Sequence, residues 1–196
     1  MIQKVSNLLR ALKQRWGPSH VKQRLWNKEF ADGRWSKLEV TTGERVYEFI
    51  EMRCRGGSIL DLGCGSGNTG NELNLQAYEA YTGVDVSDVA VEKAKERSER
   101  NGRAGKNRYY QSDIVSYVPK QMYDVILFRE SIYYIPMHKI RATLGRYSKF
   151  LTDDGVFIIT AYDRNAYASI VKLLEENFDI FGKCLGTKQE IIVVFR

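Results

Sequence analysis

A glycine-rich segment, residues 61–68 (DLGCGSGN), constrains the fold more than any other part of the chain. It follows the short apolar run 58–62, which predicts a buried strand, and it opens a helix expected over about 67–77. Glycines suit this place because the chain must turn sharply and its backbone must approach a ligand closely. The free N–H groups at the start of the following helix favour a carboxylate or a phosphate.

The chain alternates between strands and helices from this segment onward, which predicts an α/β fold with a mostly parallel sheet and right-handed crossovers. The expected strands are residues 58–62, 80–85, 108–111, 123–128, 156–161, 179–185 and 190–195. The expected helices after the first strand are residues 67–77, 87–100, 137–151 and 164–177, with Ser87 as the cap of the second. Before the first strand we expect one more helix, which Thr41 or Thr42 caps and which runs to about Arg53. A turn is expected at 153–155 and a hairpin at 186–188, so the last strand is antiparallel.

Charge is concentrated at the N-terminus of this 196-residue chain. Residues 1–37 hold nine Lys or Arg and two acids, a net charge of +7, whereas the other residues sum to −1. We therefore divide the chain into a basic helical arm, residues 1–39, and a near-neutral domain, residues 40–196. No run reaches the roughly 18 apolar residues of a membrane span, and no secretory signal is expected. The three scattered cysteines and two histidines predict no metal site and favour a cytoplasmic location.

Two further acidic positions follow the next predicted strands. Asp85 ends the strand 80–85, where a carboxylate can take both hydroxyls of a ribose. Ser112, Asp113 and Ile114 follow the third strand and are placed to meet an adenine edge. Because open α/β sheets bind ligands at the carboxyl ends of their strands, these positions and the glycine-rich turn predict one adenosine site.

A dinucleotide site is the competing interpretation, because residues 65–70 (GSGNTG) spell GxGxxG and Asp85 lies 20 residues past Gly65. A nicotinamide fingerprint does not require an acid such as Asp61 ahead of the glycines. After the predicted strands, no residues remain for a domain that would hold a hydride acceptor. Both points favour a different adenosine ligand.

Residues 61–68 (DLGCGSGN) followed by 83–87 (GVDVS) resemble the class I S-adenosylmethionine-dependent methyltransferases over residues 40–196. The resemblance implies a Rossmann-like three-layer sandwich with sheet order 3-2-1-4-5-7-6 and an antiparallel strand seven. It also implies S-adenosylmethionine as cofactor and S-adenosylhomocysteine as product. Within it, Asp61 would hold the amino end, Asp85 the ribose, and Asp113 with Ile114 the adenine. The implied cofactor contacts are Asp61, Gly63, Cys64, Gly65, Gly67, Asn68, Asp85, Val86, Asp113, Ile114 and Arg129.

The stretch after the fourth strand, residues 128–136 (FRESIYYIP), shapes the acceptor site in this family. It has neither the Asp/Asn-Pro-Pro-Tyr/Phe motif of exocyclic-amine DNA methyltransferases nor the Pro-Cys of cytosine-C5 enzymes. It is similar to this stretch in small-molecule and sugar-directed members, including the nodulation-type N-methyltransferases and enzymes of surface-polysaccharide pathways. The resemblance thus implies methylation of an O or N atom of a small molecule or saccharide.

Methyl transfer is an in-line displacement, in which the enzyme aligns the reactants and a general base helps an acceptor that must lose a proton. Glu130 is the first candidate base because it directly follows the fourth strand and faces the methyl group by family analogy. His138 is the second candidate catalytic residue, and Asp163 is a further possible base. The alternative for Glu130 is a carboxylate that caps backbone or contacts the cofactor. Tyr133, Tyr134 and Tyr162 either line the acceptor pocket or belong to the core.

The arm has several open roles. We expect the arm to form a lid, with Trp26, Phe30 and Trp35 packed over the cofactor cleft. The alternative is that the helices of the arm merely cover the edge of the sheet. Residues 1–16 repeat apolar positions at helical spacing among basic ones. Such a helix packs on the domain, lies peripherally on the inner membrane face or an anionic glycan, or binds nucleic acid. The alternative functions are accordingly an RNA-directed methyltransferase and a non-catalytic adenosyl-binding module.

Overall fold

The structure, a computed structural model, describes residues 2–37, 39, 42–185 and 189–196. The strands are β1 Ser58–Leu62, β2 Ala80–Asp85, β3 Asn107–Gln111, β4 Tyr123–Arg129, β5 Leu151–Ala161, β6 Ile180–Leu185 and β7 Ile191–Phe195. The α-helices are α1 Ile2–Trp16, α2 Ser19–Ala31, α3 Arg45–Cys54, α4 Asn68–Glu72, α5 Asp88–Arg100, α6 Met137–Tyr147 and α7 Ala168–Asn177. Short 3-10 turns are η2 Ile132–Tyr134 and η3 Ser148–Phe150.

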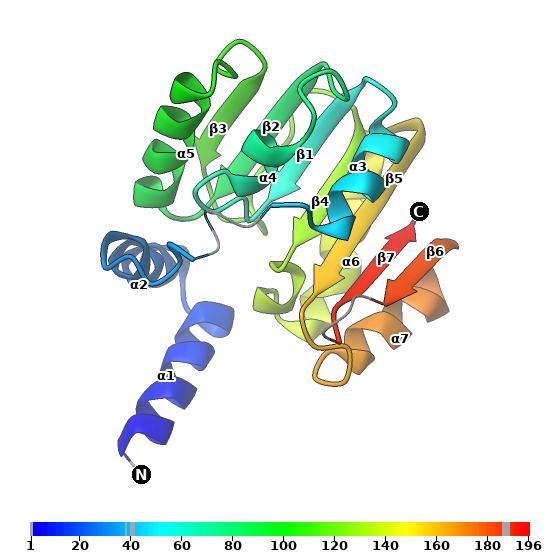
Figure 1. The fold of residues 1–196 in the computed structure, drawn as a ribbon. Helices are drawn as coiled ribbons and strands as arrows, with labels where there is room; N and C mark the ends of the chain where they lie inside the picture. Colours follow the sequence, from blue (N-terminus) through cyan, green and yellow to red (C-terminus); the bar gives the residue numbers. More distant parts are fainter. Residues whose placement is uncertain (1, 38, 40–41, 186–188) are drawn as a thin grey trace.

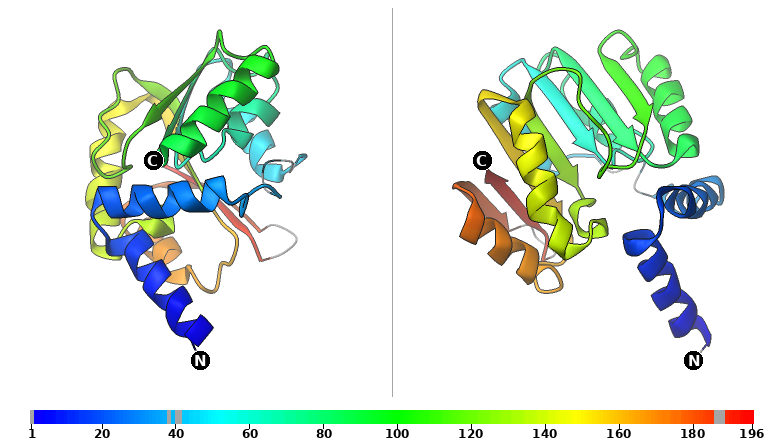
Figure 2. Two further views of the ribbon diagram at one scale, coloured as in Figure 1. Left: turned by 90° about the vertical axis from the view of Figure 1, so that its left-hand side faces the viewer. Right: turned by 180° about the vertical axis from the view of Figure 1, so that it is seen from behind.

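All seven strands form one sheet in the order β3-β2-β1-β4-β5-β7-β6. Every neighbouring pair is parallel except those of β7, which runs antiparallel to both β5 and β6. Helices α3, α4 and α5 cover one face and α6 and α7 the other, which gives three layers (Figures 1 and 2). The predicted fold class, sheet order and antiparallel strand are confirmed.

The central strand β4 shows how sequence produces these layers. Tyr123, Ile126 and Phe128 enter the core beneath α6 and α7, whereas Val125 and Leu127 enter the core beneath α3 and α5. Successive side chains of a strand point to opposite faces, so a run that is apolar at every position is buried on both sides. The apolar run VILF at residues 125–128 was therefore a sound basis for placing this strand at the centre.

Strand β5 corrects one prediction, because it begins at Leu151 and includes residues 153–155, where a turn was expected. Its pairing with β4 shifts register between Tyr123 and Val125, so the extra residues of β5 form a bulge and not a turn. Gly155 suits the bulge, since a Cβ there would lie 2.8 Å from the carbonyl oxygen of Tyr123.

Helix boundaries also differ from the prediction. Helix α4 ends at Glu72, because Leu73 is extended and fully buried and Asn74 Oδ1 accepts the N–H of Gln76. Helix α6 ends at Tyr147 and gives way to η3. Asparagine side chains that bond to nearby backbone compete with helical hydrogen bonds, which explains the early end of α4.

The starts of α3, α5 and α7 test the predicted caps. Ser87 does cap α5, since its Oγ accepts the N–H of Ala90 at 3.1 Å. Helix α3 begins after Glu44, so Thr42 is not its cap, and Thr41 lies outside the described residues. Helix α7 begins only at Ala168, because Asp163 Oδ1 accepts the N–H groups of residues 165 and 166 in a turn.

The arm crosses the edge of the sheet where the parallel strands end. Helix α2 lies over the carboxyl ends of the strands, and α1 extends beyond it, away from the sheet (Figures 1 and 2). The expected hairpin at 186–188 falls outside the described residues, although β6 and β7 pair as it requires. None of the helices described here has the length and hydrophobicity of a membrane span.

Candidate active site

The turn after β1 is built from glycines in backbone conformations that other residues avoid. Gly63, Gly65 and Gly67 have φ angles of 90°, 54° and 77°. At Gly63 a Cβ would also lie 2.5 Å from the Cβ of Ser131, which follows β4. The turn therefore keeps its backbone free of side chains on the side where the strand ends converge.

Asp61 lies beneath this turn, at the end of β1, and is fully buried. Its Oδ2 accepts the hydroxyl proton of Tyr81 at 2.5 Å, whereas its Oδ1 has no hydrogen-bond partner among the described residues. Burial raises the pKa of Asp61 to about 6, against the lowering effects of the Tyr81 hydrogen bond and the charge of Arg129. A buried hydrogen-bond acceptor without a partner at this position suits a ligand that carries a hydrogen-bond donor.

This raised pKa predicts how folding stability depends on pH. The folded protein holds the Asp61 proton up to about pH 6, whereas the unfolded chain releases it near pH 3.8. Because the folded state binds this proton more tightly, the free energy of unfolding falls as the pH rises from 3.8 to about 6. The expected loss from this group is about 2–3 kcal/mol. Urea unfolding of wild type and Asp61→Asn over this interval measures it, because all other groups are shared. Parallel curves for the two proteins would contradict the prediction.

Asp85 ends β2 directly beside the glycine turn. Its Oδ2 accepts the N–H of Gly65 and its Oδ1 accepts the N–H of Ser87, both at 2.9 Å. Burial raises the pKa of Asp85 to about 6, although the two N–H groups favour the carboxylate. Val86 follows, and its carbonyl oxygen accepts the side chain of Gln111. The structure thus joins the first and second predicted segments through one carboxylate.

Asp113 meets the arm. Its Oδ2 accepts the hydroxyl of Ser19 at 2.8 Å and the ammonium of Lys22 at 3.2 Å, and its Oδ1 accepts the N–H of Val115. Burial acts to raise the pKa of Asp113, but these three interactions outweigh it and leave that pKa below the usual value. Ile114 lies next to it, with its side chain near Gly63. The third predicted segment is thus placed at the same edge, in contact with α2.

Lys22→Ala is expected to loosen α2. The Lys22 side chain is 13% exposed in its ion pair with Asp113, and removing one partner of such a shielded pair is costly. Amide hydrogen exchange within α2 should accelerate about tenfold. The matched control is Lys28→Ala on the same helix, whose side chain is 75% exposed beside Asp32. Equal exchange in the two variants would show that the Asp113 contact does not hold the helix.

The other predicted cofactor contacts lie around the turn but are held by different groups. The Arg129 guanidinium donates to Glu44 Oε2 and lies 5.5 Å from the ring of Tyr47, and its charge also acts on Asp61. The Asn68 amide donates to the Tyr47 hydroxyl at 3.0 Å. Cys64 is buried against β2, 2.9 Å from where a Cβ on residue 83 would lie.

Glu130 follows β4 with a φ of 54°, a left-handed conformation unusual for a residue with a side chain. Its Oε1 accepts the Thr160 hydroxyl at 2.8 Å, and its Oε2 accepts the Tyr133 hydroxyl and the N–H of Tyr162, each at 3.0 Å. Burial raises the pKa of Glu130, and these hydrogen bonds act against that rise. The carboxylate is therefore fixed between β4 and β5, with a pKa shifted toward neutrality.

Aromatic rings adjoin Glu130 in a group that we call the aromatic cluster. Its members are Trp26, Trp35, Tyr133, Tyr134, Tyr162 and Tyr167. The edge of one ring meets the face of the other between Trp26 of α2 and Tyr134, with centroids 5.0 Å apart, and Tyr133 stacks on Tyr167 at 4.3 Å. Phe30, in contrast, lies over Gly65, 3.5 Å from where a Cβ would be. The structure therefore places Phe30 at the glycine turn and next to Trp26, Trp26 against Tyr134, and Trp35 against Trp26.

His138 stands apart from Glu130. It is exposed in the first turn of α6 and stacks on Trp16 of α1, with ring centroids 5.4 Å apart. The structure gives it no hydrogen bond or ion pair with the other predicted site residues among those described. Its assignment as a catalytic residue stays a prediction.

Polar contacts that were not predicted from the sequence hold the arm. Buried Glu29 accepts from Arg10, Gln14 and Trp35, and so joins α1, α2 and the turn after α2. Asp88 Oδ1 accepts the side-chain amide groups of residues 23 and 27, with the latter at 2.5 Å. The scarcity of acids in residues 1–37, which hold only Glu29 and Asp32, was the one signal in the sequence that could have indicated Glu29.

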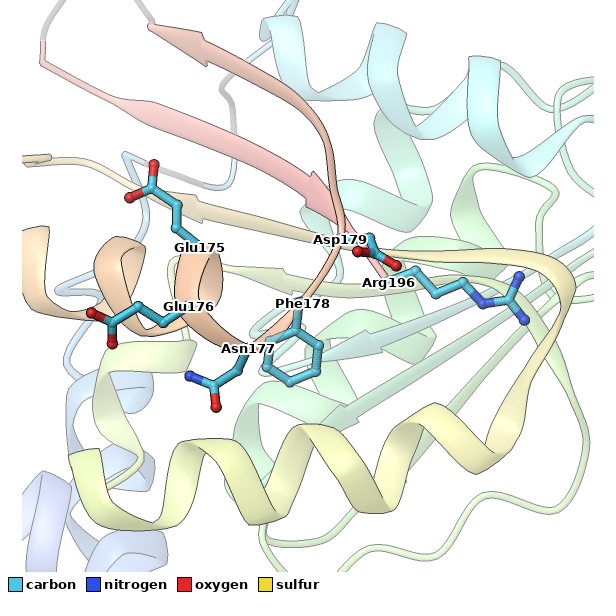
Figure 3. Close-up of a pocket in the computed structure, with 6 residues that line it drawn as sticks. All are labelled: Glu175, Glu176, Asn177, Phe178, Asp179 and Arg196. Carbon is cyan, nitrogen blue, oxygen red and sulfur yellow. The ribbon is translucent and has the colours of Figure 1, made fainter.

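A surface depression elsewhere on the molecule is not part of this site (Figure 3). Its lining residues are Glu175, Glu176, Asn177, Phe178, Asp179 and Arg196. Glu175, Glu176 and Asn177 end α7, Phe178 and Asp179 connect it to β6, and Arg196 follows β7, so these residues lie at the amino-terminal edge of the parallel strands. The glycine turn and the acidic residues lie at the opposite edge.

Comparisons with known proteins agree with this geometry. A family model described as a methyltransferase domain matches residues 54–191. The mRNA cap guanine-N(7) methyltransferase of Schizosaccharomyces pombe is 26% identical over 126 residues, which cover 60% of this chain and 35% of that protein. The 27-O-demethylrifamycin SV methyltransferase of Amycolatopsis mediterranei is 25% identical over 127 residues, which cover 60% of this chain and 46% of that protein. The chain thus spans less than half the length of these two relatives.

Solved structures share the fold. The N-methyltransferase NodS of Bradyrhizobium japonicum, in complex with S-adenosylhomocysteine, has a TM-score of 0.69 at 19% identity, covering 89% of this chain and 97% of NodS. Magnesium protoporphyrin IX methyltransferase of Synechocystis, with bound S-adenosylmethionine, has a TM-score of 0.70 at 18% identity, covering 91% of this chain and 96% of that one.

Proposed function

From the premise that this chain belongs to the class I S-adenosylmethionine-dependent methyltransferases, we propose that it methylates an O or N atom of a saccharide or another small molecule. One observation carries the proposal: the acidic and glycine-rich positions of the adenosine site and the aromatic cluster beside Glu130 lie side by side at the same sheet edge. Cofactor and acceptor positions must adjoin for a direct transfer.

The residues at this edge fit S-adenosylmethionine. Asp61 keeps a buried carboxylate oxygen free of partners, which suits an ammonium group. The positive φ angles of the three glycines support a close approach of the ligand to the backbone. We assign Asp85 to the ribose hydroxyls and Asp113 with Ile114 to the adenine, as the family resemblance implies. When bound, the cofactor supplies an electrophilic methyl group on a sulfonium.

The protein's own contribution is positioning, exclusion of water and proton removal. Helix α2 and Phe30 lie over the glycine turn and shield it from solvent. Glu130 is rigidly held, and its raised pKa brings it closer to the pH at which a general base is effective. A carboxylate oxygen can accept more than one hydrogen bond. Glu130 Oε1, which accepts one from Thr160, can therefore also accept a proton from the substrate that receives the methyl group.

The acceptor class rests on the aromatic cluster. Aromatic rings beside one fixed carboxylate are residue types typical of small-molecule recognition. The similarity to 27-O-demethylrifamycin SV methyltransferase supports this choice. The second candidate is an RNA acceptor, which the cap guanine-N(7) methyltransferases and the basic arm support.

Methyl transfer from isotopically labelled S-adenosylmethionine tests the proposal. The full chain is incubated with a panel of saccharides and small amines or alcohols, and separately with capped RNA, and labelled products are identified by mass spectrometry. Labelled small molecules support the proposal. Labelling of RNA alone would overturn the acceptor class, and tight cofactor binding without transfer to either panel would favour an adenosyl-binding module.

A further inference from the structure

Helix α1 is amphipathic, but its polar side faces the protein. Arg10 and Gln14 lie one turn apart and both reach Glu29 of α2. Leu9, Leu12 and Trp16 are spaced by three and four residues and so share one stripe, on the other side of the helix. They are 51%, 46% and 55% exposed. A helix that only covered its own domain would turn this stripe inward.

The stripe is flanked by positive charge. Lys13 is exposed and follows Leu12, and the last turn of α1 also carries Arg15. The first 37 residues carry a net charge of +7, whereas the rest of the chain is near neutral. An apolar stripe with a tryptophan and flanking basic residues is the pattern of helices that lie in a membrane interface.

We propose that α1 binds flat on an anionic phospholipid surface through Leu9, Leu12 and Trp16. Leu9, Leu12 and the exposed part of the Trp16 ring enter the headgroup–acyl boundary, while Trp16 keeps its stacking contact with His138. Lys13 and its neighbours pair with lipid phosphates. The placement of α1 agrees with this, because the helix extends away from the sheet (Figures 1 and 2). The side chains of the stripe are about half exposed.

Two other occupants fit less well. A second copy paired stripe to stripe would bring the Lys13 side chains and the two basic arms together, and like charges repel. Nucleic acid would neutralise the charge through its phosphates but would leave the apolar stripe in water. An anionic membrane satisfies both features at once.

The position of the stripe gives membrane binding a direction. Trp16 stacks on His138, which follows the carboxyl end of β4, so the stripe begins beside the edge that carries the aromatic cluster. A membrane held by α1 would lie next to that edge. Binding itself does not rest on the proposed methyl transfer, and its failure would leave that function untouched.

Vesicle flotation of the full chain tests the proposal. We expect wild type to float with vesicles of mixed phosphatidylglycerol and phosphatidylcholine and to remain behind with phosphatidylcholine alone. The double variant Leu9→Gln, Leu12→Gln should lose about tenfold or more in apparent affinity, because two apolar side chains no longer enter the interface. Lys13→Glu should lose about tenfold through one lost attraction and one added repulsion.

The matched controls are Val118→Gln and Lys149→Glu, which change similarly exposed residues away from α1 and should float as wild type does. Circular dichroism confirms that each variant is folded. Absence of flotation, equal binding to neutral vesicles, or equal losses in the controls would overturn the proposal. Two other results, each without vesicle binding, would also overturn the proposal. One is a wild-type dimer that the double leucine variant dissociates, and the other is RNA binding that Lys13→Glu abolishes.

Discussion

Asp85→Ala is expected to weaken binding of S-adenosylhomocysteine about a thousandfold, because the two charge-assisted hydrogen bonds that we propose to the ribose hydroxyls would together contribute about 4 kcal/mol. The same carboxylate accepts the N–H groups of Gly65 and Ser87, so its loss also loosens the glycine turn that lies against the ligand. Isothermal titration calorimetry of the purified protein measures the change directly.

Two further variants keep this result interpretable. Asp85→Asn retains an oxygen acceptor without the charge and should show an intermediate loss, which separates the ribose contact from a collapse of the turn. Asp154→Ala removes an exposed acid on β5 and serves as the control. If Asp85→Ala melts as a folded protein and binds as wild type does, the ribose assignment is wrong.

Glu130→Gln is expected to lower turnover about a hundredfold while the affinity for S-adenosylhomocysteine stays the same, because a general base typically contributes that much or more. In wild type the rate should rise with pH through the pKa of Glu130, which burial raises above its usual value, and this limb should vanish in the variant. Steady-state rates across pH, with the acceptor identified by product screening, give the measurement.

Thr160→Val distinguishes a base from a structural carboxylate. The Thr160 hydroxyl lowers the pKa of Glu130, so its removal should move the pH limb upward, whereas a purely structural role would change stability alone. Glu176→Gln, in the depression of Figure 3 at the far edge, is the matched control and should leave the profile unchanged. If Glu130→Gln turned over as wild type does and His138→Ala lost turnover, His138 and not Glu130 would be the general base.

Strand placement was predictable because it depends on local apolar runs. The fully apolar stretches of β4 and β7 are buried on both faces, and that burial leaves a strong signal in sequence. The beginning of β5 was not predictable, since Asp153 and Asp154 have turn chemistry and only the bulge opposite Tyr123 admits them to the strand.

The site was predictable where a single segment defines it and not where distant segments meet. The glycines, Asp61 and Asp85 follow from strand ends and turn geometry. The hydroxyl of Tyr81 on Asp61, and Ser19 and Lys22 on Asp113, depend on how separate elements pack, which no local pattern encodes. The arm was expected to contact the domain through aromatic rings. It also contacts the domain through hydrogen bonds of polar side chains, which were not expected.

Helix α2 touches both halves of the site, through Lys22 at Asp113 and through Trp26 at Tyr134. A rigid helix of 13 residues cannot lift from one of these contacts without straining the other. Any molecule that displaces α2 on one side therefore alters the affinity on the other, and thermodynamic linkage makes this effect reciprocal. With the cofactor and acceptor positions that we propose, binding of one is therefore coupled to binding of the other through α2.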